Sequence, residues 1–226
     1  MSVAFDANAT SPVSASGVTT IDLTTLTVGT GANRALVVQL SHATKTITNE
    51  SMNWDQTGSP QACTSIKAAN GSGSDGRAEL WGLVAPTSGA KTLRHSWTGI
   101  SDVIINAVSW TGADQTGGAT TFPNSTSATG TSTTPSVTVT SAVNHATMDA
   151  SAAPVASSPY SAPSKTQTYA TFEGNIIGAG SRAAGAASNV HSWTIVSGPW
   201  VSVGTDIIDA TTNPTGPFPT FRPDLA

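Results

Sequence analysis

The sequence of 226 residues contains few charged side chains, which make up 10% of the chain, against about 25% in ordinary soluble domains. Only nine of them are Lys or Arg, and these are scattered singly along the chain. Without a basic stripe, a protein has no surface that neutralises a row of phosphates, so we expect no nucleic-acid partner. The surface is instead expected to be neutral and rich in the hydroxyl groups of Ser and Thr.

The sequence also lacks paired cysteines and long apolar runs. Cys63 is the single cysteine, so it cannot form an internal disulfide, and we interpret it as a small buried hydrophobic residue. Residues 1–6 carry neither the basic nor the apolar part of a secretory signal. No apolar stretch reaches the length of about 18 residues that crosses a bilayer. We therefore expect a chain that is made in the cytosol, stays soluble and has no membrane partner.

Patterns that mark metal sites and active sites are missing as well. The histidines, His42, His95, His145 and His191, stand singly, without the short spacings that gather ligands around zinc. No serine has the glycine frame of a nucleophile at a strand-to-helix turn. These absences predict a protein with no catalytic residues, no metal and no cofactor.

Some carboxylates lie near aromatic residues or loops, where a pair could share the acid and base roles of hydrolysis. They are Asp55, Glu79, Asp102 and Glu173. Glu79 alternates with apolar neighbours in a strand-like run, so its side chain is expected to point outward to solvent. The loop at residues 70–76 offers a few oxygen atoms to calcium, but a strong site gathers several carboxylates. Neither group leads us to predict catalysis or metal binding.

What the sequence has in abundance is the pattern of β-strands. Helical periodicity is scarce, and the best helical candidate, residues 181–188, is interrupted by glycine. β-branched residues and hydroxyls alternate in segments bounded by turn residues, as expected for sheets with one buried face. Core strands are predicted at residues 34–42, 78–84, 102–110 and 200–208. Weaker strands are predicted at residues 19–28, 91–98, 136–140 and 191–196.

These strands favour one all-β domain, a single two-sheet antiparallel β-sandwich over residues 1–209. The motif His-Ser-Trp-Thr occurs at residues 95–98 and again at 191–194. We interpret this repeat as a sign of two equivalent halves, about 1–112 and 131–209. If the repeats pair, His95 and His191 become neighbours.

The connecting and terminal segments have a different composition. Residues 111–135 are poor in large apolar side chains and are expected to form an exposed crossover between the halves. Residues 210–226 contain four prolines and two phenylalanines, a composition that predicts an extended C-terminal arm without ladder hydrogen bonds.

The six tryptophans are the largest apolar side chains in the sequence. Trp81, Trp110 and Trp193 lie within strand-like runs and are expected in the core. Trp54 lies in a polar run and Trp200 follows a Gly-Pro pair, so each could sit at a loop edge and stack on a sugar ring or a partner. Loop tryptophans also plug the ends of sandwiches, which is the alternative for these two.

Several segments are characteristic in combination. They are SVAFDA at residues 2–7, NRALVV at 33–38, AELWGLV at 78–84, AVSWTGADQ at 107–115, TSTTPSV at 131–137 and the stretch 192–200. With them, residues 2–209 resemble the jelly-roll-like β-sandwich proteins of tailed-phage virions and related bacterial surface modules. The resemblance implies a virion or surface accessory protein and carries over no catalytic residue. Residues 145–150 depart from it by being less apolar than usual, so this strand is expected at an edge or an interface.

We therefore predict a non-enzymatic structural or accessory protein of a tailed bacteriophage virion, such as a capsid decoration or a head or tail appendage. It is expected to form a homo-oligomer, with a trimer favoured, and to contact the major capsid or tail protein. The residues of the arm that would dock on a partner are Pro214, Pro217, Phe218, Pro219, Phe221, Arg222 and Pro223. The alternative is a carbohydrate-binding module or host-surface adhesin, in which Trp54 and Trp200 hold a host glycan.

Overall fold

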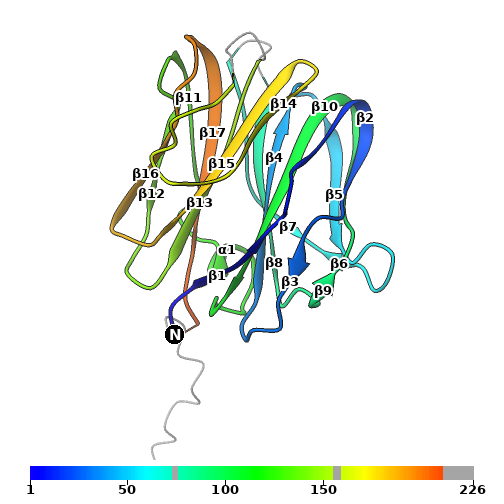
Figure 1. The fold of residues 1–226 in the computed structure, drawn as a ribbon, viewed down its shortest axis with the longest axis vertical. Coiled ribbons are helices and arrows are strands. Elements are labelled where there is room, and N and C mark those ends of the chain that lie inside the picture. The colour runs from blue at the N-terminus through cyan, green and yellow to red at the C-terminus, as the bar shows by residue number, and fades with distance from the viewer. Residues whose placement is uncertain (73–75, 155–158, 211–226) are drawn as a thin grey trace, which may run out of the picture.

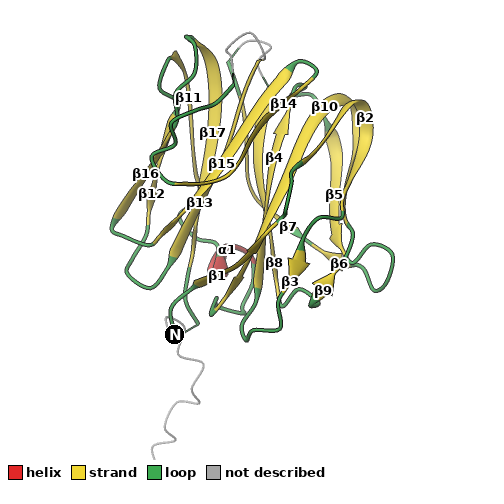
Figure 2. Ribbon diagram, viewed as in Figure 1, coloured by secondary structure: helices red, strands yellow, loops and turns green. Residues whose placement is uncertain are grey.

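The computed structural model describes residues 1–72, 76–154 and 159–210, and strands dominate it (Figures 1 and 2). The described chain contains one short helix, α1 (Gly118–Thr121). The all-β prediction is confirmed. Across these ranges the structure contains no helix with the length and apolar character needed to cross a bilayer. The predicted docking residues of the arm lie outside the described residues.

The first part of the chain forms an eight-stranded antiparallel sheet, the large sheet. Its strands are β1 (Ala4–Asn8), β2 (Val13–Leu23), β4 (Ala35–His42), β5 (Thr48–Trp54), β6 (Gln61–Ala62), β7 (Thr64–Asn70), β8 (Arg77–Val84) and β10 (Leu93–Thr111). The main path runs β6-β5-β10-β4-β8-β7, and β1 and β2 also pair with β10. The predicted core strands at residues 34–42, 78–84 and 102–110 all fall in this sheet.

Strand β10 is 19 residues long and changes neighbours along its length. Its first part pairs with β5, and its second part pairs with β4. The register shifts between these parts, around Gly99, whose φ of 103° favours glycine. The large sheet therefore curls, and it encloses a core of its own that contains Leu40, Met52 and Trp54.

The second part of the chain forms a five-stranded antiparallel sheet, the small sheet. Its strands are β11 (Thr126–Ser132), β13 (Ala146–Pro154), β14 (Thr166–Glu173), β15 (Ile176–Ala184) and β17 (Gly198–Ile207). Their order is β11-β17-β13-β15-β14. Alternate residues such as Met148 and Val203 pack against Leu80 and Ile104 of the large sheet. Two sheets packed face to face confirm the predicted sandwich, whereas the jelly-roll connectivity stays a prediction.

A third layer covers the outer face of the small sheet. The strands β12 (Ser136–Thr140) and β16 (Ser188–Ser192) form a two-stranded ribbon that lies beside β17 and β11 (Figure 1). A further core, which includes Tyr160, Trp193 and Trp200, lies on this side. A second two-stranded ribbon joins β3 (Thr27–Val28) to β9 (Gly89–Ala90).

Strand β13 corrects the prediction that residues 145–150 lie at an edge or an interface. It occupies the centre of the small sheet and is buried on both faces. Its sequence is less apolar than usual because one face carries Thr147, Asp149 and Ser151. All three are fully buried and hydrogen bonded to other buried side chains.

A smaller prediction is also wrong. Residues 111–135 are not only a crossover, because they contain β11, which forms an edge of the small sheet with alternating small side chains. The glycine-interrupted stretch at residues 181–188, which was not predicted as a helix, is mostly strand, since β15 runs to Ala184 and β16 begins at Ser188. The large sheet comes from residues 4–111 and the small sheet from residues 126–207, but the equivalence of two halves stays a prediction.

Candidate functional site

The sequence suggested that Trp54 and Trp200 could lie at exposed loop edges, but both side chains are buried. Trp54 is 0% exposed and its indole Nε1 donates a hydrogen bond to the Thr87 carbonyl oxygen. Trp200 is 6% exposed, and its Nε1 donates to Ser132 Oγ. Trp54 belongs to the core enclosed by the large sheet and Trp200 to the core on the outer side of the small sheet, so neither offers a free ring face to a sugar. The expected exposure of these two residues is wrong.

The other sequence predictions for tryptophan and cysteine are confirmed. Trp81, Trp110 and Trp193 are buried in the three cores, at 7%, 3% and 2% exposure. Cys63 is a free buried thiol. Burial raises the pKa of Cys63 to about 12, so the thiolate that would react is scarce at neutral pH.

The two His-Ser-Trp-Thr repeats do not pair, and His95 is not a neighbour of His191. His95 lies on β10 and faces the core enclosed by the large sheet. His191 lies on β16, against the outer face of the small sheet, where Ser181 and Thr147 contact its ring nitrogens. Both histidines are buried, but they lie in different layers and do not form a common site.

A buried polar cluster instead forms in the core enclosed by the large sheet, and we call it the His–Glu cluster. It consists of His42, Glu50, Arg77, Glu79, Trp81, His95 and Trp97. These residues come from β4, β5, β8 and β10, which are neighbours in the order β5-β10-β4-β8. The curl of the sheet brings β5 and the first part of β10 over β4 and β8.

Arg77 holds the acidic side of the cluster together. Its Nη2 donates a hydrogen bond of 2.7 Å to Glu50 Oε1, and its Nε donates to Glu79 Oε1. The other oxygen of Glu79 accepts a 2.7 Å hydrogen bond from Trp81 Nε1. Glu79 is fully buried, so the prediction that it points to solvent is wrong. Burial raises the pKa of Glu79 to about 7, and Glu50 adds to the rise while Arg77 opposes it.

The two histidines of the cluster face each other without hydrogen bonds. Their ring centroids are 5.4 Å apart, and both rings contact Trp97. Among the described residues, no hydrogen-bond partner reaches either ring nitrogen of His42 or of His95. Burial lowers the pKa of His95 to about 4 and also holds the pKa of His42 well below its usual value. Both imidazoles are therefore neutral at pH 7 and carry free lone pairs.

Sequence reasoning missed this cluster because its members are far apart in the chain. His42 and His95 are separated by 53 positions, and the two acids lie in different strands, Glu50 in β5 and Glu79 in β8. One signal was present: His42 and Glu79 are polar residues in largely apolar strand segments. A polar side chain in a core strand requires a polar partner across the sheet, but the sequence does not show which strand supplies it.

Two further candidate carboxylates, Asp102 and Glu173, accept hydrogen bonds that connect distant segments of the chain. Asp102 accepts hydrogen bonds from Ser16 Oγ and from the backbone N–H groups of Gly17 and Asn175. Glu173 accepts a hydrogen bond of 2.6 Å from Ser14 Oγ. These contacts tie β2 to the turn between β14 and β15, so they join the two sheets.

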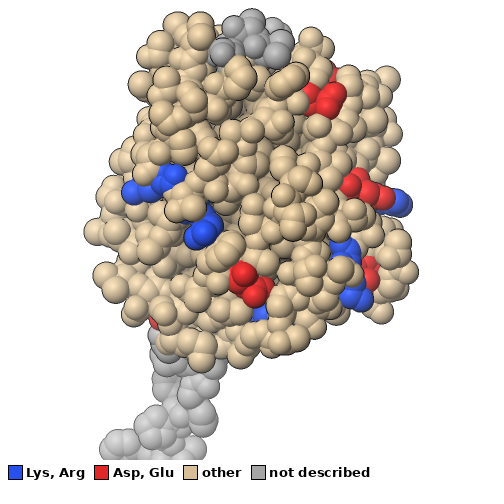
Figure 3. Space-filling model, viewed as in Figure 1, with Lys and Arg blue, Asp and Glu red and all other residues tan. Residues whose placement is uncertain are grey.

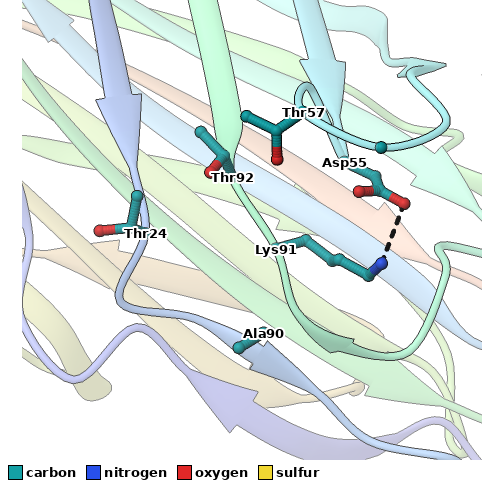
Figure 4. A pocket seen from close by; sticks show the side chains of 7 residues that line it. Thr24, Asp55, Thr57, Ala90, Lys91 and Thr92 are labelled. Atoms are coloured by element: carbon teal, nitrogen blue, oxygen red, sulfur yellow. Dashed lines mark ion pairs between the residues drawn. The ribbon is translucent and has the colours of Figure 1, made fainter.

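Asp55 belongs to a surface groove of about 310 Å³ at the end of β5. Thr24, Thr57, Gly58, Ala90, Lys91 and Thr92 complete its lining. Figure 4 shows the Lys91 ammonium turned toward the Asp55 carboxylate, at 3.1 Å, with the threonine side chains around the pair. Burial by itself would raise the pKa of Asp55, but hydrogen bonds from Lys91 and the Ser59 backbone hold it below its usual value. The groove thus presents hydroxyls and an ion pair to solvent.

In comparisons with known proteins, no family model and no curated protein matches this chain.

Proposed function

We propose that the protein is a non-enzymatic accessory protein of a tailed bacteriophage virion, a capsid decoration or a head or tail appendage. The observation that carries this proposal is the way the chain uses its acidic residues. Seven of them are buried and serve as internal hydrogen-bond or ion-pair partners: Asp55, Glu79, Asp102, Asp114, Asp149, Asp206 and Asp209. Few charges are left for the surface.

The face drawn in Figure 3 accordingly shows few charged side chains, singly or in small groups, on a neutral background. A neutral, hydroxyl-rich surface loses little hydration energy when another protein covers it, because burying unpaired charges is the costly part of association. Apolar side chains also stand out from it, including Ile100, Val143 and Phe172, at 68%, 77% and 61% exposure. Both features suit repeated contacts with identical copies and with a capsid or tail lattice.

The experiment measures the mass of the purified full chain by light scattering after size exclusion, over a wide range of concentrations. We expect a homo-oligomer, with a trimer favoured. A variant that ends at Ala210 lacks residues 211–226, all but the first residue of the predicted arm at residues 210–226, and is expected to dissociate while its circular dichroism spectrum and melting temperature stay unchanged. A full chain that remains monomeric at high concentration would contradict the proposal.

The groove lined by Asp55 and Lys91 favours a second candidate function, the binding of a host glycan. Threonine hydroxyls and an ion pair can donate and accept hydrogen bonds to sugar hydroxyls without any tryptophan stacking. This reading moves the predicted glycan contact away from Trp54 and Trp200, which are buried. Virion appendages could carry both functions on different surfaces.

A glycan array tests this candidate. Saturable binding that is lost in Thr24→Val and Lys91→Met would support the groove as the site. The matched control is Thr138→Val, which removes an exposed threonine hydroxyl from β12 in another layer. Absence of binding on the array, or equal binding by all variants, would exclude the groove.

A further inference from the structure

The His–Glu cluster concentrates buried polar atoms that have no hydrogen-bond partner within the described chain. These atoms are the two ring nitrogens of His42, the two of His95, Glu50 Oε2 and the indole Nε1 of Trp97. A buried polar atom that loses its hydrogen bonds to water costs about 1–3 kcal/mol if nothing replaces them. Folded proteins therefore keep such groups where they have a ligand or a function. Both histidines are 0% exposed, so bulk water does not satisfy them.

The imidazole and carboxylate atoms among these converge on one point. One ligand atom from each of His42, Glu50 and His95 lies within 4.8 Å of the other two. The distance from His95 Nε2 to Glu50 Oε2 is 3.6 Å. A tetrahedral Zn²⁺ with bonds of 2.0–2.2 Å has ligand atoms about 3.3–3.6 Å apart. The His95–Glu50 edge already has this length, and the widest edge needs a contraction of at most about 1.5 Å.

The surroundings orient the ligands. Arg77 donates a hydrogen bond to Glu50 Oε1. The other oxygen, Oε2, lies 3.6 Å from His95 Nε2 and has no hydrogen bond within the described chain. This is the arrangement in which a neighbouring group fixes a ligating carboxylate. The charged side chains around the point are Glu50, Glu79 and Arg77. Arg77 balances one of the two acids, so the cluster carries a net negative charge, which favours a cation, whenever Glu79 is also ionised.

We propose that His42, His95 and Glu50 bind one divalent metal ion of the Zn²⁺ class. Two imidazoles and one carboxylate form a ligand set that suits Zn²⁺ and not Mg²⁺ or Ca²⁺, which prefer oxygen ligands alone. With three protein ligands, Zn²⁺ takes a water molecule as its fourth ligand. The ion joins β4, β5 and β10 and holds the large sheet in its curled form. This inference is independent of the proposed virion function and of the glycan groove.

The test uses the full chain after treatment with EDTA and removal of the chelator. Titration with ZnCl₂ in a calorimeter is expected to show one site per chain, whereas MgCl₂ is expected to show none. CoCl₂ is expected to produce the visible absorption bands of a tetrahedral Co²⁺ centre, and added Zn²⁺ should abolish them. No heat of binding with Zn²⁺, or a Co²⁺ spectrum typical of six oxygen ligands, would overturn the proposal.

Two variants locate the site. Glu50→Gln keeps the size of a partly exposed side chain, and His95→Gln removes a ligand from the core. Each should weaken Zn²⁺ binding by more than the 10–100-fold that loss of a supporting residue causes. The matched controls are His145→Gln, at a histidine outside the cluster that contacts Asp206, and Cys63→Ala. Both should bind Zn²⁺ as the unmodified chain does.

If His95→Gln folds poorly, the melting temperature of the other variants, measured with and without Zn²⁺, still tests the proposal. Zn²⁺ should raise the melting temperature of the unmodified chain and of both controls, but not that of Glu50→Gln, because a ligand that binds the native state stabilises it. An equal rise in Glu50→Gln, or the loss of binding in His145→Gln or Cys63→Ala alone, would place the ion elsewhere and refute the assignment.

Discussion

The indole Nε1 of Trp193 donates a hydrogen bond of 2.9 Å to Asp149 Oδ2, and both side chains are buried. Asp149 belongs to β13, at the centre of the small sheet, whereas Trp193 follows β16 in the layer above it. Ser181 also donates to Asp149, from its backbone N–H and from its hydroxyl. One buried carboxylate therefore anchors the outer layer to the sandwich.

We expect Asp149→Ala to lower the free energy of unfolding by about 3–5 kcal/mol, the loss typical of removing one member of a buried charged network. The variant leaves the Trp193 and Ser181 donors without an acceptor. Urea unfolding followed by tryptophan fluorescence measures the change. The control is Asp22→Asn, which breaks a more exposed pair with Arg94 and should have a far smaller effect. Equal losses in the two variants would contradict the anchoring role.

The ionisation of Asp149 should also make the stability of the protein depend on pH. Burial by itself would raise the pKa of Asp149, but hydrogen bonds from His191, Trp193 and Ser181 lower it below the ordinary value. Because the folded pKa lies below the unfolded pKa, the stabilisation is fully present above about pH 4, the ordinary aspartate pKa. It is lost as the pH falls through the lower folded value.

Acid unfolding monitored by circular dichroism tests this expectation. Asp149→Asn keeps the shape of the side chain but has no charge to lose, so its stability should fall less between pH 4 and pH 2 than that of the unmodified chain. Parallel stability curves for the two proteins across this range would show that another group controls the acid transition.

Cys63 should be unreactive in the folded protein. It is 8% exposed, and burial raises its pKa to about 12. We expect no modification by a thiol reagent such as dithionitrobenzoate under native conditions, and one equivalent after unfolding in guanidinium chloride. Rapid labelling of the native chain, at the rate of a small free thiol, would show that the core around β5 opens readily.

Gly130 is required by close packing on Trp200. A Cβ atom at this position would lie 2.7 Å from the indole ring, so the ring must move. We expect Gly130→Ala to cost about 1–3 kcal/mol of stability, as for other overpacked sites, and to shift the tryptophan emission. The neighbouring Thr129→Ala, on the exposed face of β11, should change stability by no more than about 0.5 kcal/mol. Equal effects would indicate that β11 is loosely packed.

The sequence predicted the strands well where one face of a sheet meets solvent or where β-branched residues run together. The predictions succeeded for β4, most of β8 and the second part of β10, which were expected at residues 34–42, 78–84 and 102–110. They succeeded because side-chain alternation, or a short apolar run, reflects the burial of neighbouring residues. The same reasoning failed for β13, where hydroxyls and a carboxylate are buried. A hydroxyl that points to solvent and one that points into a third layer look identical in the sequence.

The candidate sites show the same difference between what is local in the sequence and what depends on the tertiary structure. The sequence by itself determined the class of the protein: alternating small side chains, β-branched runs and scarce charge lead to sheets packed on each other, because these properties act within a few residues. Only the tertiary structure decided which polar groups meet. The curl of β10 brings His95 to His42, and it buries Trp54. Contacts between residues about 50 positions apart depend on the strand order and on the bend at Gly99. Neither of these can be recognised from the few residues around each position.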